Sequence, residues 1–208
     1  MHYSVISYVL FIDFLSIMSP GPDFFMVLKN SLTGSLKFGI FTAFGIMLGT
    51  LITFTLCMLG VGIIVAENHI LFTLIKVAGA LYLAYLGIGA IFSKATVQEP
   101  QLVEHDQKLD TQNIKTYFKI GLLCNLTNPK AMMFMTALSA YVAIHGNPKL
   151  DGMVIIPIST FLTGAWFIAV ATLFGNFHIR KFFYQRQRMI NIILGLILLY
   201  VAHTIIFM

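Results

Sequence analysis

Two charged residues, Asp23 and Lys130, lie inside long apolar stretches of the chain, and each directly follows a proline. An ionisable side chain at membrane depth is costly unless it is paired or hydrated, so such residues mark candidate functional sites. Together a carboxylate and an ammonium complement the two charged groups that an α-amino acid carries on one carbon. The pair therefore predicts a binding site for a zwitterion. A direct Asp23–Lys130 salt bridge that only holds two parts of the chain together is the structural alternative.

Both charged residues follow segments that should break a helix. The first is Ser-Pro-Gly-Pro at residues 19–22, and the second is Asn-Leu-Thr-Asn-Pro at residues 125–129. Proline removes a backbone donor and clashes with the preceding turn, so each segment should unwind the chain. Asn128 is a good N-cap, and Pro129 suits the first position of a new helix. We expect these segments to contact substrate beside Asp23 and Lys130, through Gly21, Pro22, Asn125, Asn128 and Pro129.

A third ionisable residue, Asp13, precedes the first break. Burial would favour its protonated form, so Asp13 and Asp23 are the candidates for carrying a coupling proton. Alternatively, Asp13 forms a structural bridge with Lys76 or His203.

The composition indicates that lipid is the main solvent of the chain. Of its 208 residues, 58% are hydrophobic and only 10% are charged, and the mean hydropathy is +0.88. Soluble domains carry roughly 25% charged residues. The net charge of +5 does not indicate nucleic acid, because Lys and Arg gather in a few short connections.

Other chemistries lack their motifs. GxSxG, HExxH and Cys/His clusters are absent, and Cys57 and Cys124 lie in apolar runs as small packing side chains. We therefore predict neither an enzyme, nor a resident metal site, nor a cofactor.

Six apolar stretches are long enough to cross the roughly 30 Å of hydrocarbon, where the backbone must be helical. They are residues 3–28, 38–66, 70–92, 117–144, 153–177 and 189–208. We predict an all-α membrane protein with a three-helix repeat at 1–92, a linker at 93–116 and a second repeat at 117–208.

The positive charges predict the orientation. Ten of the 13 Lys and Arg residues lie in the connections after helices 1, 3 and 5 or just beyond them: Lys29, Lys37, Lys94, Lys108, Lys115, Lys119, Arg180, Lys181, Arg186 and Arg188. The positive-inside rule then places both termini outside. The two halves have opposite topology, and each has its break in its first helix, which is the best sequence indication of a transporter's midplane site. A helix 1 that enters and returns as a hairpin would instead leave the N-terminus inside.

Four motifs resemble the LysE/RhtB family of amino-acid exporters. They are Ser19–Phe25, the Gly39 to Gly45 approach, the segment from Lys76 through Gly79 and Tyr82 to Gly87, and the segment from Gly121 through Asn125 to Ala131. The form Pro-Gly-Pro-Asp-Phe-Phe is most similar to the threonine exporter branch, whereas Asp13 departs from the family pattern. The resemblance implies export of threonine- or homoserine-like amino acids from the bacterial cell across its inner membrane, driven by the proton-motive force.

Two alternatives remain open: a metal-ion exporter of similar architecture, and a passive channel. A homo-oligomer is also possible.

Overall fold

The computed structural model describes residues 1–33, 35–67, 69–92, 114–174 and 177–206, and the regular secondary structure of these residues is entirely α-helical. The predicted all-α class is thus confirmed. Most of the predicted linker, residues 93–113, lies outside the described part. The helices are α1 (Tyr3–Met18), α2 (Pro22–Thr33), α3 (Leu36–Glu67), α4 (His69–Phe92), α5 (Ile114–Leu126), α6 (Pro129–His145), α7 (Pro148–Leu173) and α8 (Phe177–Ile206).

The first predicted helix is broken where its prolines require it. Ser19 ends α1 with an extended backbone, φ −67° and ψ 126°, as expected for the residue before a proline. Pro22 then begins α2, and the two helices are bent by 50° relative to each other.

The second break has the predicted cap. Asn128 has an extended backbone, φ −77° and ψ 106°, and its side-chain oxygen accepts a 3.0 Å hydrogen bond from the Lys130 backbone N–H. Pro129 takes the first position of α6, where its missing N–H costs nothing. Asn128 and Pro129 therefore begin a new helix that carries Lys130 in its first turn.

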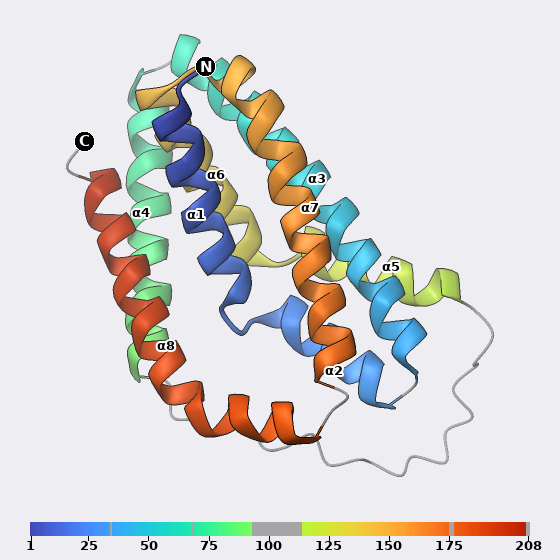
Figure 1. The fold of residues 1–208 in the computed structure, drawn as a ribbon. Coiled ribbons are helices and arrows are strands. Elements are labelled where there is room, and N and C mark those ends of the chain that lie inside the picture. The colour runs from blue at the N-terminus through green and yellow to red at the C-terminus, as the bar shows by residue number, and fades with distance from the viewer. Residues whose placement is uncertain (34, 68, 93–113, 175–176, 207–208) are drawn as a thin grey trace.

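Figure 1 shows how the helices pack around these breaks. The long helices α3 and α7 lie against each other, α5 packs on α3, and α4 pairs with α8. The start of α1 and the end of α8 lie toward the same end of the molecule. At that end His2 holds α1 to α7: its backbone N–H and its ring Nδ1 lie 3.0 and 2.9 Å from the two carboxylate oxygens of Asp151.

Two apolar clusters form the core. One includes Val9, Leu138 and Ile155 and joins α1, α3, α4, α6, α7 and α8. The other includes Phe24 and Val170 and joins α2 to one end of α3 and of α7. The helix breaks lie between these clusters.

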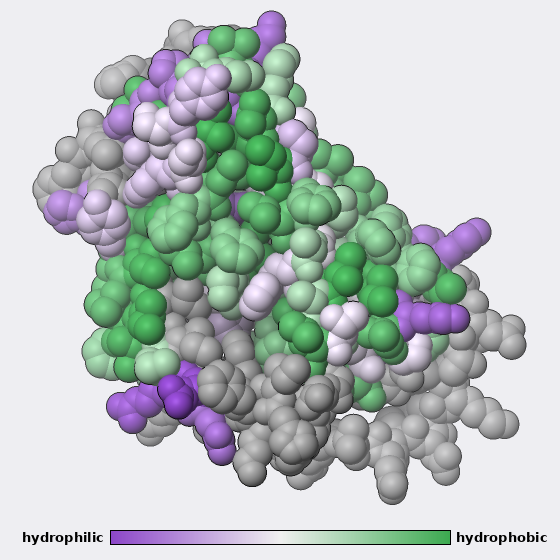
Figure 2. Space-filling model, viewed as in Figure 1, coloured by the Kyte–Doolittle hydropathy of each residue, from purple (hydrophilic) through white to green (hydrophobic). Residues whose placement is uncertain are grey.

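The described surface suits a lipid environment. Figure 2 shows hydrophobic side chains over the middle of the molecule and hydrophilic ones mostly toward its edges. Large apolar side chains are exposed on several helices, including Leu56, Leu59, Leu81, Tyr85, Phe161 and Leu196. An apolar surface of this extent marks contact with a membrane.

Length and hydropathy identify fewer spans than the sequence predicts. Among the described residues, Leu36–Gly60 and Pro148–Leu173 are each long and apolar enough to cross a bilayer, and Tyr3–Met18 with Pro22–Leu32 would be a third broken span. The count of six spans stays a prediction.

Two predicted connections are largely helical, which corrects the sequence analysis. Residues 178–188 belong to α8, and residues 29–37 are mostly taken up by the end of α2 and the start of α3. Neither connection contains proline, and residues 178–188 are rich in the helix formers Arg, Lys and Gln. Falling hydropathy marks where a helix leaves hydrocarbon, not where the helix begins or ends.

Glycines let two helix pairs approach closely. A Cβ atom at Gly45 of α3 would collide with the backbone oxygen of Phe118, and one at Gly121 of α5 would collide with that of Thr42. Gly87 of α4 and Gly195 of α8 face each other's backbone oxygens in the same way. Small residues at such crossings allow the backbone contact that stabilises helix pairs in membranes.

We therefore predict that Gly121→Ala destabilises the protein by about 1–3 kcal/mol, because α3 and α5 must separate to admit the methyl group. Gly89→Ala is the matched control, since an added Cβ there meets nothing within 4 Å. Thermal unfolding of the detergent-purified variants, followed by size-exclusion chromatography, measures both. Equal melting temperatures for the two variants would contradict the close-packing argument.

Candidate functional site

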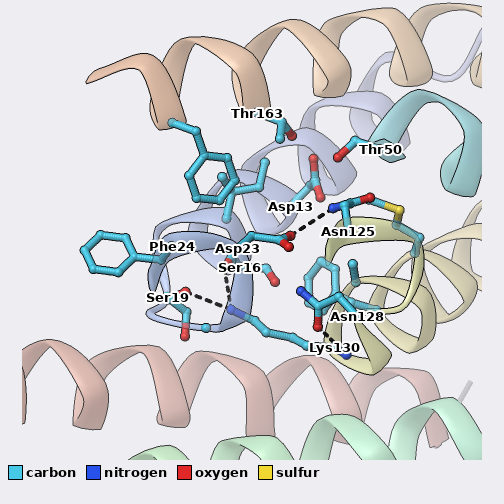
Figure 3. Close-up of a pocket in the computed structure, with 16 residues that line it drawn as sticks. Asp13, Ser16, Ser19, Asp23, Phe24, Thr50, Asn125, Asn128, Lys130 and Thr163 are labelled. Atoms are coloured by element: carbon cyan, nitrogen blue, oxygen red, sulfur yellow. Dashed lines mark hydrogen bonds between the residues drawn. The ribbon is translucent and has the colours of Figure 1, made fainter. Parts of the chain in front are cut away.

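A pocket lies between the two apolar clusters, at the helix breaks. Figure 3 shows the polar residues that line it: Asp13, Ser16, Ser19, Asp23, Thr50, Asn125, Asn128, Lys130 and Thr163. Its apolar walls come from Ile17, Phe24, Phe134, Met135 and Phe167.

Lys130 reaches from one break to the other. Its Nζ donates to the backbone oxygens of Ser16 and Ser19, at 3.0 and 2.8 Å. These carbonyls lie at the C-terminal end of α1, where a positive charge is favoured; the Ser16 carbonyl also accepts a 3.1 Å hydrogen bond from the Ser19 backbone N–H. Two of the three ammonium protons are thereby used, which leaves one for a further acceptor.

Gly21 gives Lys130 the room for this contact. A Cβ atom at Gly21 would lie 3.3 Å from Lys130 Cδ and 3.5 Å from its Nζ. The contact with Cδ is tight, so a methyl group at this position would require the lysine side chain to shift by a few tenths of an ångström.

Asp23 is buried at the start of α2 and is only partly satisfied. The Asn125 amide Nδ2 donates a 2.9 Å hydrogen bond to Asp23 Oδ2. The other carboxylate oxygen, Asp23 Oδ1, is buried without a hydrogen-bond partner, and so is the amide oxygen of Asn125. The Cys124 side chain also interacts with the Asp23 carboxylate, so a weak thiol donor lies beside these acceptors.

No direct salt bridge between Asp23 and Lys130 is formed in the described part of the chain. Each charge has its own partners: helix carbonyls for Lys130 and the Asn125 amide for Asp23. Figure 3 shows both side chains at the same pocket. The pocket thus holds two opposite charges that interact electrostatically without direct contact, and the structural alternative stays open.

Asp13 lies in the same pocket and is almost fully buried. The Ser159 hydroxyl of α7 donates to Asp13 Oδ2 at 2.5 Å. The predicted bridge from Asp13 to Lys76 or His203 stays a prediction, and the Lys76 side chain lies outside the described residues.

The predicted site residues are mostly brought together. Gly21, Asp23, Asn125, Asn128, Lys130 and Asp13 line the pocket. Pro22 and Pro129 are not among its lining residues; they begin α2 and α6 and so position the residues that follow.

Ser16, Thr50, Thr163 and Ser159 were not predicted as site residues. Small hydroxyl residues are common in membrane helices, and α3 and α7 are apolar all round, so their sequences give no sign of which face meets a pocket.

A helical membrane protein with two broken helices around a charged pocket has features expected of a transporter. The LysE type translocator family model matches residues 14–208, so the chain belongs to that family. It is therefore a multi-pass membrane transporter and not an enzyme.

Relatives agree with this assignment. The chain is 33% identical over 184 residues to the threonine efflux protein of Escherichia coli K12, covering 86% of this chain and 85% of that protein. It is 30% identical over 178 residues to the threonine efflux protein of Salmonella typhimurium, with 86% and 85% covered. It is 29% identical over 170 residues to the membrane protein YrhP of Bacillus subtilis, with 80% of each covered. No solved structure gives a significant match.

Proposed function

We propose that the protein exports small neutral amino acids, threonine- or homoserine-like, across the bacterial inner membrane by proton antiport. One observation carries the proposal: a pocket at two helix breaks holds a lysine on one break and a half-satisfied carboxylate on the other. The names of the threonine efflux relatives support the same substrate class.

The charged groups fit the backbone of an amino acid. Its carboxylate binds Lys130 at the N-terminal end of α6, where the helix dipole also favours an anion. Its ammonium binds the two unpaired oxygens, Asp23 Oδ1 and Asn125 Oδ1. An ammonium has three donors, so it can satisfy both acceptors at once.

A metal-ion exporter fits less well. No group of three or more His, Cys, Asp or Glu side chains suited to a metal ion occurs among the described residues. The Lys130 ammonium would also repel a cation at the pocket.

The inverted-repeat arrangement is part of the proposal. The second helices of the predicted halves, α3 and α7, pack together, and so do the third helices, α4 and α8. Pairing of equivalent elements is what a pseudo-twofold axis in the membrane plane would produce.

Of the ten charges that predict the orientation, Lys94 and Lys108 lie outside the described residues.

The first prediction for this function is loss of export in Asp23→Asn. The amide keeps the hydrogen bond from Asn125 but removes the charge that binds the ammonium. Lys130→Gln removes a charge-assisted bond worth roughly 1.5–3 kcal/mol, so amino-acid affinity should fall about ten- to a hundredfold. Intracellular amino-acid levels in dipeptide-fed cells, at matched amounts of membrane protein, measure both effects, with Lys149→Gln on the exposed end of α7 as control.

The exchange Asp23→Lys with Lys130→Asp tests the structural alternative. It would place a carboxylate against the Ser16 and Ser19 carbonyls, so neither folded protein nor export should return. Full export by this double variant would disprove the binding-site interpretation.

A second prediction concerns orientation. Because positive charges should mark the cytoplasmic side, reporter fusions that need export to fold should be active at Asn147 and Met208 and inactive at Gln112. Activity at Gln112 would overturn both the orientation and the inverted repeat.

A third prediction concerns coupling. We assign the coupling proton to Asp13, since Asp23 is assigned to the ammonium. Asp13→Asn retains an oxygen to accept from Ser159, so it should still exchange internal for external substrate in vesicles. It should not export against a gradient, and an uncoupler should abolish such export by the unmodified protein in sodium-free medium.

Export that survives the uncoupler excludes proton antiport. If Asp13→Asn exports normally while the uncoupler still acts, the proton is carried by Asp23 instead.

A further inference from the structure

Two threonines in the pocket, Thr50 and Thr163, lack the hydrogen bond that several other threonines of this protein make to their own helix. A helical threonine commonly donates its hydroxyl to the carbonyl four residues earlier. Thr42, Thr55, Thr127, Thr136 and Thr172 all do so. Thr50 of α3 and Thr163 of α7 do not, and their hydroxyls have no hydrogen-bond partner.

Burial makes these unpaired hydroxyls significant. Thr50 is 1% exposed and Thr163 is 2% exposed. A buried polar group without a partner is unfavourable, although a bond to the group's own helix is the common solution for threonine. Both side chains line the pocket, and Figure 3 shows them on the two sides of Asp13. Among the buried threonines with unpaired hydroxyls, Thr50 and Thr163 are the two that line the pocket, so theirs are the hydroxyls that a ligand in the pocket would meet.

The threonines lie where the side chain of the substrate would be. In Figure 3, Asp23 and Asn125 lie between Lys130 and the Thr50–Thr163 pair. An amino acid whose carboxylate meets Lys130 and whose ammonium meets Asp23 would extend its side chain toward these hydroxyls. We propose that Thr50 and Thr163 are specificity-determining residues that bind a hydroxyl group on the substrate's side chain. This inference rests on the proposed amino-acid site.

A hydroxyl suits the chemistry of this end of the pocket. It can donate to one group and accept from another, as two unpaired threonine hydroxyls require. An aliphatic side chain would leave both of them unsatisfied. The same pocket also contains apolar side chains such as Phe167 and the Asp13 carboxyl group, which lies between the two threonines and offers a further acceptor for a hydroxyl proton.

The test compares threonine with valine, which replaces the hydroxyl by a methyl group of similar size. The purified protein is reconstituted in proteoliposomes, and each amino acid competes for uptake of labelled threonine. The unmodified protein should prefer threonine by at least about tenfold. Thr50→Val and Thr163→Val should bring that preference close to unity, chiefly by weakening threonine binding.

The chain offers matched controls in the same two helices. Thr53 and Thr160 are also buried with unpaired hydroxyls, but they do not line the pocket. Thr53→Val and Thr160→Val should leave the preference unchanged. Thr50→Ser and Thr163→Ser, which keep the hydroxyl, should also retain it. If a valine variant does not fold, the alanine variant at the same position replaces it.

Each outcome has a distinct meaning. If the unmodified protein transports no amino acid, the proposed function fails and this inference with it. If it transports threonine but folded Thr50 and Thr163 variants lacking the hydroxyl keep the full preference, this inference alone fails. Stronger competition by lysine or arginine than by threonine would also overturn it.

Discussion

Inside a bilayer every backbone polar group must find a partner within the protein. Each of the two helix breaks leaves backbone groups without their helical hydrogen-bond partners. Lys130, in the first turn after one break, bonds the Ser16 and Ser19 carbonyls at the other. Asn128 caps its own side of the second break. The pocket exists because these groups hold two interrupted helices face to face without filling the space between them.

Close packing around the breaks supports this arrangement. Gly49 of α3 lies against Asn125, and an added Cβ there would come within 2.7 Å of the Asn125 amide oxygen. Asn125 can thus reach Asp23 only because α3 carries no side chain at this point. On the other side, α7 supplies Ser159 to Asp13 and contributes to both apolar clusters. The charged groups are therefore positioned by helices that are themselves almost uncharged.

The sequence predicted the helix breaks and the charged residues that line the pocket, for a physical reason. Proline, glycine and an Asn-Pro cap act on the local backbone. Residues such as Gly21 and Asn128 therefore indicate where helices end, whatever those helices pack against. An ionisable residue in an apolar run, such as Asp13 or Lys130, can likewise be recognised from the sequence as a candidate functional residue. The partners of these residues are set by tertiary packing. The carbonyls that bind Lys130 carry no signature in the sequence, and Thr50 and Thr163 look like any other threonine of a uniformly apolar helix. The start of α8 was misplaced because hydropathy reports immersion in lipid and not helicity.

The contacts of Lys130 connect substrate binding to the shape of α1. In this structure the Lys130 ammonium binds the carbonyls at the end of α1. In the proposed mode of substrate binding it would also bind the substrate carboxylate. The third N–H of the Lys130 ammonium can bind the substrate carboxylate without disturbing α1. If the ammonium donated two hydrogen bonds to the carboxylate, at least one of its bonds to the Ser16 and Ser19 carbonyls would be lost. A released Ser16 carbonyl would keep its hydrogen bond from the Ser19 backbone N–H, whereas a released Ser19 carbonyl would need another donor. Tight binding of a carboxylate and a change at the α1–α2 bend are thus favoured together, which is the link that a ligand needs in order to shift a conformational equilibrium.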